Sequence, residues 1–145
     1  MITLDTSGFW AATNRTDPFH AAVRAVLDAD PGPWLIPAGI LTEIAWIIGA
    51  REREEKPSLQ TLQEFLADLD SGQYTLDCGE DDFPRISELV TRYHDLGLDF
   101  SDAAVIACAE RRAGRCLTTD YRHFPVVARG EKTIIILPQI GAHEA

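Results

Sequence analysis

The stretch Ile2-Thr3-Leu4-Asp5-Thr6-Ser7-Gly8 decides the fold class. A short apolar run ends in an aspartate, and Ser7-Gly8 then begins a turn or a helix. We interpret residues 2–4 as a short buried strand whose carboxyl end carries Asp5. Further short strands are predicted at residues 34–36, 74–76, 115–118 and 133–137, the last of them strongly β-branched.

Helical patterns separate these strands. Asp17-Pro18 is typical of a helix start, and Pro37 opens a second helix. Apolar residues then recur at helical spacing over residues 59–69, from residue 83 up to Gly97, and over about 101–113. Short apolar strands that alternate with helices form parallel sheets covered on both faces. We therefore predict a three-layer α/β/α fold around a central, mainly parallel five-stranded sheet.

The composition is that of a globular chain. It has 145 residues, of which 46% are hydrophobic, enough for a core of ordinary proportions, and we expect a single domain over residues 1–145. No stretch approaches the roughly 20 apolar residues of a membrane span, and no signal segment is evident. Three cysteines without Cys-x-x-Cys spacing indicate neither a disulfide framework nor a zinc ribbon. We expect a soluble, unprocessed protein of the cytoplasm.

The net charge of −10 argues against a protein that binds nucleic acid through a broadly basic surface. Of the 13 cationic residues, however, 11 are arginine, whose planar guanidinium suits phosphate oxygens. An arginine-rich genome explains the same bias at least as well. Charge alone therefore leaves the ligand open.

Two aspartates, Asp5 and Asp120, come directly after predicted strands. In open parallel sheets the ligand site lies outside the carboxyl ends of the strands, because the loops converge there. Each aspartate taken alone is also typical of a turn or a helix cap. Two acids at equivalent strand ends favour a shared site.

Two further acids lie on predicted helices. At about 100° per residue, Asp102 shares a helix face with the apolar Val105 and Ile106. An acid in the first turn also complements the helix dipole. The dipole explains why Asp102 lies in the first turn, but not why it lies on the apolar face of the helix. Asp99 is expected to cap this helix and adds an acid near the site. Glu43 borders the buried stripe of the helix after Pro37, with pairing to a surface cation as the ordinary alternative.

A cluster of these carboxylates predicts a bound cation, because burying several unpaired acids together is costly. Oxygen ligands suit Mg²⁺ or Mn²⁺ and disfavour zinc. The hydroxyls that flank the strand-end acids are candidate supporting groups, although hydroxyls are also common in turns: Thr6, Ser7, Thr118 and Thr119. Each histidine is expected at the surface, but His123, three residues after Asp120, is close to the predicted site. The sequence carries no phosphate-binding glycine loop and no Cys/His pair.

Four motifs stand in order along nearly the whole chain: Leu4-Asp5-Thr6-Ser7, Pro37 with Glu43 six residues on, Asp99-Phe100-Ser101-Asp102-Ala103, and Leu117-Thr118-Thr119-Asp120 followed by Phe124. This ordered set resembles the PIN-domain ribonucleases. In size and motif layout the chain is similar to the toxin half of a VapBC toxin–antitoxin pair.

The resemblance implies a Mg²⁺- or Mn²⁺-dependent endoribonuclease that hydrolyses RNA phosphodiester bonds and leaves 5′-phosphate and 3′-hydroxyl ends. By that likeness the acidic metal-binding and catalytic set is Asp5, Glu43, Asp102 and Asp120. Thr6 or Ser7 and Thr118 would be its supporting hydroxyls. It also implies the strand order 3-2-1-4-5, a homodimer, and an antitoxin protein whose tail covers the active site.

Two other functions remain open from the residues. A phosphatase or phosphoacceptor domain also uses an aspartate at a strand end, but it would want a second aspartate where Ser7 stands, or a lysine at the carboxyl end of the last strand, which Lys132 precedes. A catalytically silent interaction module would keep the fold and bind a protein. Intact acids at all four positions argue against decay without proving turnover.

Overall fold

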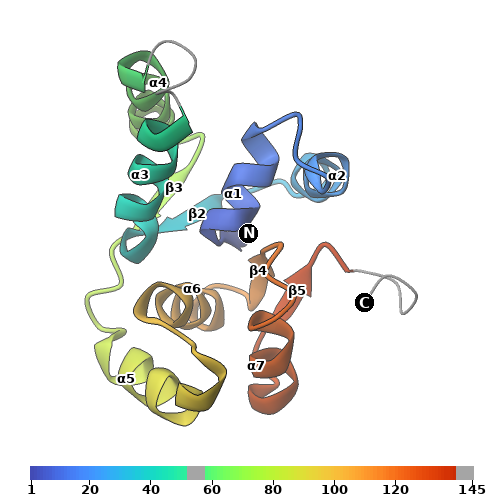
Figure 1. Ribbon diagram of the computed structural model, residues 1–145, viewed down its shortest axis with the longest axis vertical. Helices are drawn as coiled ribbons and strands as arrows, with labels where there is room; N and C mark the ends of the chain where they lie inside the picture. Colours follow the sequence, from blue (N-terminus) through green and yellow to red (C-terminus); the bar gives the residue numbers. More distant parts are fainter. Residues whose placement is uncertain (52–57, 140–145) are drawn as a thin grey trace.

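A five-stranded parallel sheet forms the centre of the computed structural model, which describes residues 1–51 and 58–139 (Figure 1). The strands are β1 (Ile2–Leu4), β2 (Trp34–Pro37), β3 (Thr75–Asp77), β4 (Arg115–Leu117) and β5 (Ile135–Leu137). They lie in the order β3-β2-β1-β4-β5, and every neighbouring pair is parallel. The strand order that the resemblance implied is confirmed.

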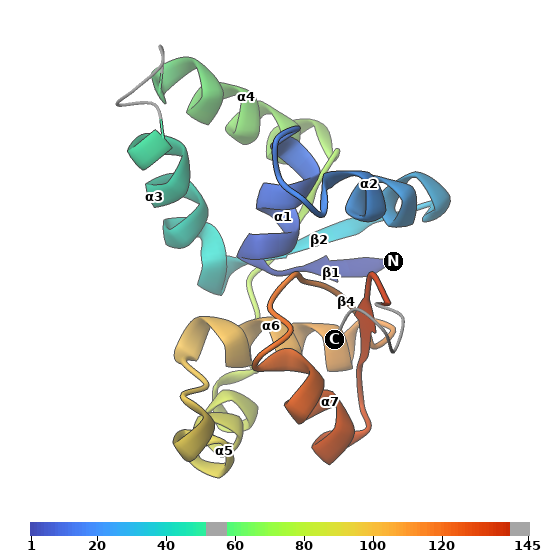
Figure 2. The same ribbon diagram turned by 45° about the vertical axis from the view of Figure 1, so that its right-hand side comes forward.

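Helices cover both faces of the sheet, which gives three layers (Figure 2). On one side lie α1 (Thr6–Thr13), α2 (His20–Ala29), α3 (Leu41–Arg51) and α4 (Ser58–Ser71), and on the other α5 (Phe83–Arg92), α6 (Phe100–Arg111) and α7 (Phe124–Glu131). Short 3-10 turns at Ala38–Ile40 and His94–Leu96 precede α3 and α6. The α/β/α prediction is confirmed. Within the described ranges, none of the helices has the length and apolar character needed to cross a membrane.

The strands of the sheet end close to one level. Leu4 of β1 lies opposite Leu117 of β4, and Pro37 of β2 lies opposite Asp77 of β3. The residues that follow β1 and β4 therefore emerge side by side at the carboxyl edge of the sheet. This register brings Asp5 next to the loop after β4, where the Asp5 N–H donates to the Leu117 carbonyl at 2.9 Å.

The core beneath this edge is tightly packed. All of β1 is buried, and α6 buries an unbroken run from Ala103 to Ala109. On the other face, a Cβ atom at Gly8 would lie 2.3 Å from the Leu117 carbonyl oxygen. Only glycine therefore lets α1 sit directly against β4. This close approach brings the side chains at the start of α1 to the edge of β4.

Some element boundaries differ from the prediction, and α7 was not predicted. Its amphipathic signal is short, since only Phe124 and Val127 are buried along it. The helix expected from Asp17-Pro18 begins instead at His20, because Asp17 Oδ1 accepts the Phe19 N–H at 2.8 Å and forms a turn. The helix expected up to Gly97 ends as an α-helix at Arg92, and a 3-10 turn follows.

Candidate active site

Asp5 is buried at the carboxyl end of β1 and begins the site. Its Oδ2 accepts hydrogen bonds from Ser7 Oγ and Thr118 Oγ1, each at 2.9 Å. Asp5 occupies the N-cap position of α1, but its side chain makes no capping hydrogen bond to that helix. Burial raises the pKa of Asp5 and the charge of Glu43 adds to the rise, which the hydroxyl hydrogen bonds offset only in part.

The two hydroxyls on Asp5 also hold the loop after β4. Ser7 Oγ accepts the Thr119 N–H at 3.0 Å, and Thr118 Oγ1 accepts the Asp120 N–H at 3.0 Å. Each hydroxyl thus donates its proton to the carboxylate and accepts from the loop backbone. The network fixes the place where the chain presents Asp120. Ser7 and Thr118, predicted as supporting hydroxyls, therefore lie directly on the acids, whereas the structure gives the Thr119 hydroxyl no such contact.

Glu43 reaches the same edge from the first turn of α3. Its Oε1 accepts the Thr6 hydroxyl proton at 3.0 Å, and Thr6 is the residue that follows Asp5. Among the side chains that the structure describes, Glu43 pairs with no lysine or arginine, and its partner is the Thr6 hydroxyl.

Asp102 and Asp99 form a reciprocal cap at the start of α6. Asp99 Oδ1 accepts the Asp102 N–H at 2.9 Å, and Asp102 Oδ2 accepts the Asp99 N–H at a long 3.3 Å. The predicted capping role of Asp99 is confirmed. Burial raises the pKa of Asp102 to about 7, with further upward contributions from the charges of Asp99, Asp5 and Asp120. Asp102 is therefore a cap and also part of the acidic group.

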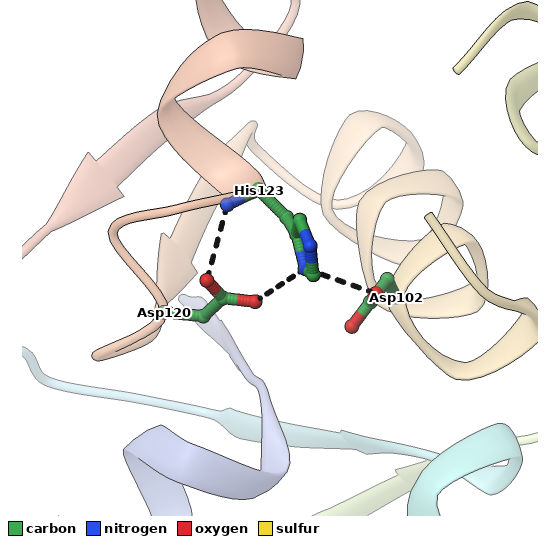
Figure 3. A group of neighbouring side chains, drawn as sticks. All are labelled: Asp102, Asp120 and His123. Carbon is green, nitrogen blue, oxygen red and sulfur yellow. Dashed lines mark hydrogen bonds and ion pairs between the residues drawn. The ribbon is translucent and has the colours of Figure 1, made fainter. Parts of the chain in front are cut away.

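Asp120, Asp102 and His123 converge on one point (Figure 3). His123 Nδ1 lies 3.0 Å from Asp120 Oδ2 and 3.8 Å from Asp102 Oδ2. One potential ligand atom from each of the three residues lies within 4.8 Å of the other two. The second oxygen of Asp120 accepts the N–H groups of Arg122 and His123 at 3.0 and 3.1 Å, so the predicted turn role of Asp120 also holds.

The four predicted acids are brought to one edge of the sheet but form two groups. Asp102 and Asp120 gather around His123, whereas Asp5 and Glu43 are held from the α1 side by hydroxyls. Electrostatic coupling joins the groups, because the charge of Asp5 raises the pKa of Asp102. His123 was outside the predicted acidic set, and its spacing of three residues after Asp120 was the signal that could have found it.

The acids of the site are not paired with lysine or arginine in the part of the chain whose side chains the structure describes. Among residues 1–49 and 59–139, whose side chains the structure describes, no lysine or arginine forms an ion pair with Asp5, Glu43, Asp102 or Asp120. Carboxylates held together without a counter-charge repel one another, and such clusters persist chiefly where a metal ion neutralises them. The donor set, mostly carboxylate oxygens, is the kind that divalent cations bind.

Comparison with known proteins places this geometry in a family. The family model described as PIN domain matches residues 2–130 of the chain. The chain therefore belongs to the PIN-domain family.

Two individual proteins are similar to the chain. The chain is similar to ribonuclease VapC26 of Mycobacterium tuberculosis, with 28% identity over 137 residues that cover 91% of this chain and 98% of the relative. Its fold is similar to that of the crystal structure of VapC20 from the same organism, described as a Sarcin-Ricin loop cleaving toxin. That match has a TM-score of 0.67, 17% identity, and coverage of 88% of this chain and 95% of the other. The chain is thus a distant homologue of the VapC ribonuclease toxins.

Proposed function

We propose that the protein is a metal-dependent endoribonuclease, the toxin component of a toxin–antitoxin system. The observation that carries this proposal is the meeting of Asp102 and Asp120 beside the buried Asp5, with no lysine or arginine paired to them in the described residues. Homology to VapC ribonuclease toxins supports the substrate class, RNA. The reaction is hydrolysis of the RNA phosphodiester bond.

The residues at the sheet edge fit a divalent ion. Asp5, Glu43, Asp102 and Asp120 offer carboxylate oxygens from the ends of β1 and β4 and the first turns of α3 and α6. Hard oxygen donors in this number suit Mg²⁺ or Mn²⁺. When bound there, such an ion supplies Lewis acidity: it lowers the pKa of a water and stabilises charge on the scissile phosphate.

The contribution of the protein is to hold these carboxylates ready. Ser7 and Thr118 fix one oxygen of Asp5, and Thr6 fixes one oxygen of Glu43. Two backbone N–H groups fix one oxygen of Asp120 and leave the other directed toward Asp102 and His123. Because each acid keeps a free lone pair in a fixed orientation, the site needs little rearrangement to receive a cation and a phosphate.

Two protein partners belong to the proposal: a second copy of the chain in a homodimer, and a cognate antitoxin. Homology to VapC toxins supports the antitoxin. Exposed apolar side chains along α3 and α4 offer a surface for protein contact, namely Trp46, Leu59 and Leu66, with Trp46 71% exposed. Trp34, by contrast, packs against the core.

The test is cleavage of mixed and hairpin RNA by the purified protein in EDTA, Mg²⁺ or Mn²⁺, with the product ends mapped. We expect cutting only with a divalent ion, and 5′-phosphate and 3′-hydroxyl ends. Undiminished cutting in excess EDTA would contradict the metal mechanism. Phosphomonoester hydrolysis without RNA cleavage would favour the phosphatase alternative, and inertness toward RNA under every condition would favour a silent interaction module.

A further inference from the structure

His123 contributes a nitrogen to a site otherwise made of carboxylates. Its side chain is 14% exposed, and Nδ1 is the ring atom that faces both Asp120 Oδ2 and Asp102 Oδ2 (Figure 3). The group joins two places in the fold: Asp102 in the first turn of α6, and Asp120 and His123, three residues apart in the loop between β4 and α7. Tertiary packing, and not sequence proximity alone, therefore makes the group.

The distances are close to those in the coordination sphere of a single ion. Adjacent ligands at about 2.1 Å from an octahedral ion lie about 3.0 Å apart, and opposite ligands about 4.2 Å apart. The distance of 3.0 Å from Nδ1 to Asp120 equals that of an adjacent pair, and the 3.8 Å to Asp102 lies between the two values. An ion held by these three atoms would need only small side-chain movements.

His123 is not needed to orient the Asp120 carboxylate. Oδ1 of Asp120 already accepts two backbone N–H groups, at 3.0 and 3.1 Å, which set the direction of the carboxylate. The imidazole meets Oδ2, the oxygen that faces the other acid. Nδ1 lies at hydrogen-bond distance from Oδ2, and as a ligand it would carry no proton, which would then sit on Nε2.

We propose that His123 Nδ1 is a ligand of the divalent ion, together with Asp102 and Asp120, and that the site consequently selects Mn²⁺ over Mg²⁺. This inference rests on the proposed function and names the metal preference of the same site. Mg²⁺ is a hard ion that prefers oxygen donors and keeps its water, whereas imidazole nitrogen suits transition-metal ions.

The direct test is electron spin echo spectroscopy of the wild-type protein loaded with Mn²⁺. Modulation from a directly bound imidazole nitrogen is expected in the wild type. It should vanish in His123→Asn and persist in His94→Asn, a matched control at an exposed histidine of the turn before α6. A wild-type spectrum without nitrogen coupling would overturn the proposal whether or not the variant folds.

The asparagine variant replaces the imidazole nitrogen with an amide, whose oxygen suits Mg²⁺ at least as well as Mn²⁺. Its amide can donate to Asp120 from near the place of Nδ1, but it has no imidazole nitrogen. Calorimetric titration should give tighter Mn²⁺ than Mg²⁺ binding in the wild type. In His123→Asn, Mn²⁺ affinity should fall by at least about tenfold, the smallest loss seen when even an outer-shell partner is removed. An unchanged ratio of the two affinities would overturn the proposal.

RNA cleavage measured beside these experiments distinguishes failure of this inference from failure of the proposed function. Nitrogen coupling without cleavage in either metal would leave His123 as a ligand and overturn the ribonuclease. Metal-dependent cleavage without nitrogen coupling would keep the ribonuclease and overturn the ligand. Wild-type protein that binds neither Mn²⁺ nor Mg²⁺ would overturn both.

Discussion

Acids gather in two regions of this protein, and their neighbours differ. In the region around Arg111, the buried acids Asp77 and Asp82 pair with arginine. Asp77 pairs with Arg111 and Arg112 at 2.6 and 2.9 Å, and Asp82 pairs with Arg111 at 2.8 Å. At the carboxyl edge of β1 and β4, the acids face hydroxyls, backbone N–H groups, a histidine and one another.

The pKa values diverge accordingly. Hydrogen bonds and charge from Arg111 and Arg112 lower the pKa of Asp77 against the effect of burial. Burial also raises the pKa of Glu131, but bonds from Tyr93, Arg85 and Arg92 outweigh it and bring the value to about 2. Asp5 and Asp102 have raised pKa values. Acidic residues thus stabilise the fold where an arginine supplies the counter-charge. Where no arginine does so, their raised pKa values are those expected of a site that binds an external cation.

The largest expected effect comes from removing one uncompensated acid. Asp102→Asn should reduce RNA cleavage by more than about 100-fold, since loss of even an outer-shell partner costs 10–100-fold. The metal-free variant should be as stable as the wild type or more stable, because one repelling charge is gone. The measurements are a cleavage assay and urea unfolding in EDTA. Asp81→Asn, at an exposed acid of the β3–α5 loop, is the control and should change neither.

Removing an acid that is paired with arginine should lower the stability of the protein and leave RNA cleavage unchanged. Glu131→Gln should destabilise the protein by about 2 kcal/mol, because Arg85, Arg92 and Tyr93 lose a charged acceptor, and should leave RNA cleavage intact. Glu88 is a matched control, since it is exposed and pairs with the same two arginines. Its glutamine variant should cost no more than about 1 kcal/mol in urea unfolding. Equal losses in the two variants would contradict a special role for the buried acid.

The two regions should also respond to pH with opposite sign. The native state holds the Asp102 proton up to about pH 7, whereas the unfolded state releases it near 3.8. The metal-free protein should therefore gain stability as the pH falls from 7 toward 4. Glu131 affects stability at lower pH. Its contribution to the free energy of unfolding is fully present above about pH 4.5 and is lost as the pH falls toward 2.

Urea midpoints in EDTA at pH 7, 5 and 3 test this pH profile. Asp102→Asn should flatten the rise between pH 7 and 5 and keep the loss at pH 3. Glu131→Gln should keep the rise and weaken the loss. A wild type whose stability falls steadily from pH 7 to 5 would show that the acids at the sheet edge do not repel one another.

The smallest expected effect concerns a cation beside the uncompensated acids. Arg122 is exposed, two residues after Asp120, and within the described residues it forms no ion pair. It is therefore available to RNA phosphate. Arg122→Gln should lower the slope of log affinity against log salt by about 0.7, the value for one contact to a single strand. Arg129 is also exposed and lies on α7, and Arg129→Gln should leave the slope unchanged. Equal effects of the two substitutions would show that Arg122 is not part of the binding surface.

Much of the fold could be predicted because strand and helix signals alternate cleanly. Ile2–Leu4 is buried on both faces, as its apolar run before Asp5 indicated. Helix α7 escaped prediction because eight residues with two buried side chains carry little periodicity. The start of α2 moved because the Asp17 side chain bonds locally to the Phe19 N–H, a choice that periodicity does not encode.

The site was predictable where position along a strand decides it. Asp5 and Asp120 follow β1 and β4, which pair in register. Because the carboxyl ends of parallel strands lie at the same edge of a sheet, the two acids were expected to lie close together. The compensation of the other acids was not predictable, because Arg111 reaches Asp82 and Asp77 across 29 and 34 residues of sequence. Position after a predicted strand did not distinguish the arginine-paired Asp77 from Asp5, and only the family resemblance, through the motif that contains Asp5, did so.

The most direct test of the central claim is urea unfolding of the wild type and Asp102→Asn with and without Mn²⁺. At a hundredfold excess over its dissociation constant, an ion that binds only the native state stabilises it by about 2.7 kcal/mol. We expect that gain in the wild type and a much smaller one in the variant. A wild type that gains nothing from Mn²⁺, or a variant that gains as much as the wild type, would contradict a cation site built from the uncompensated acids.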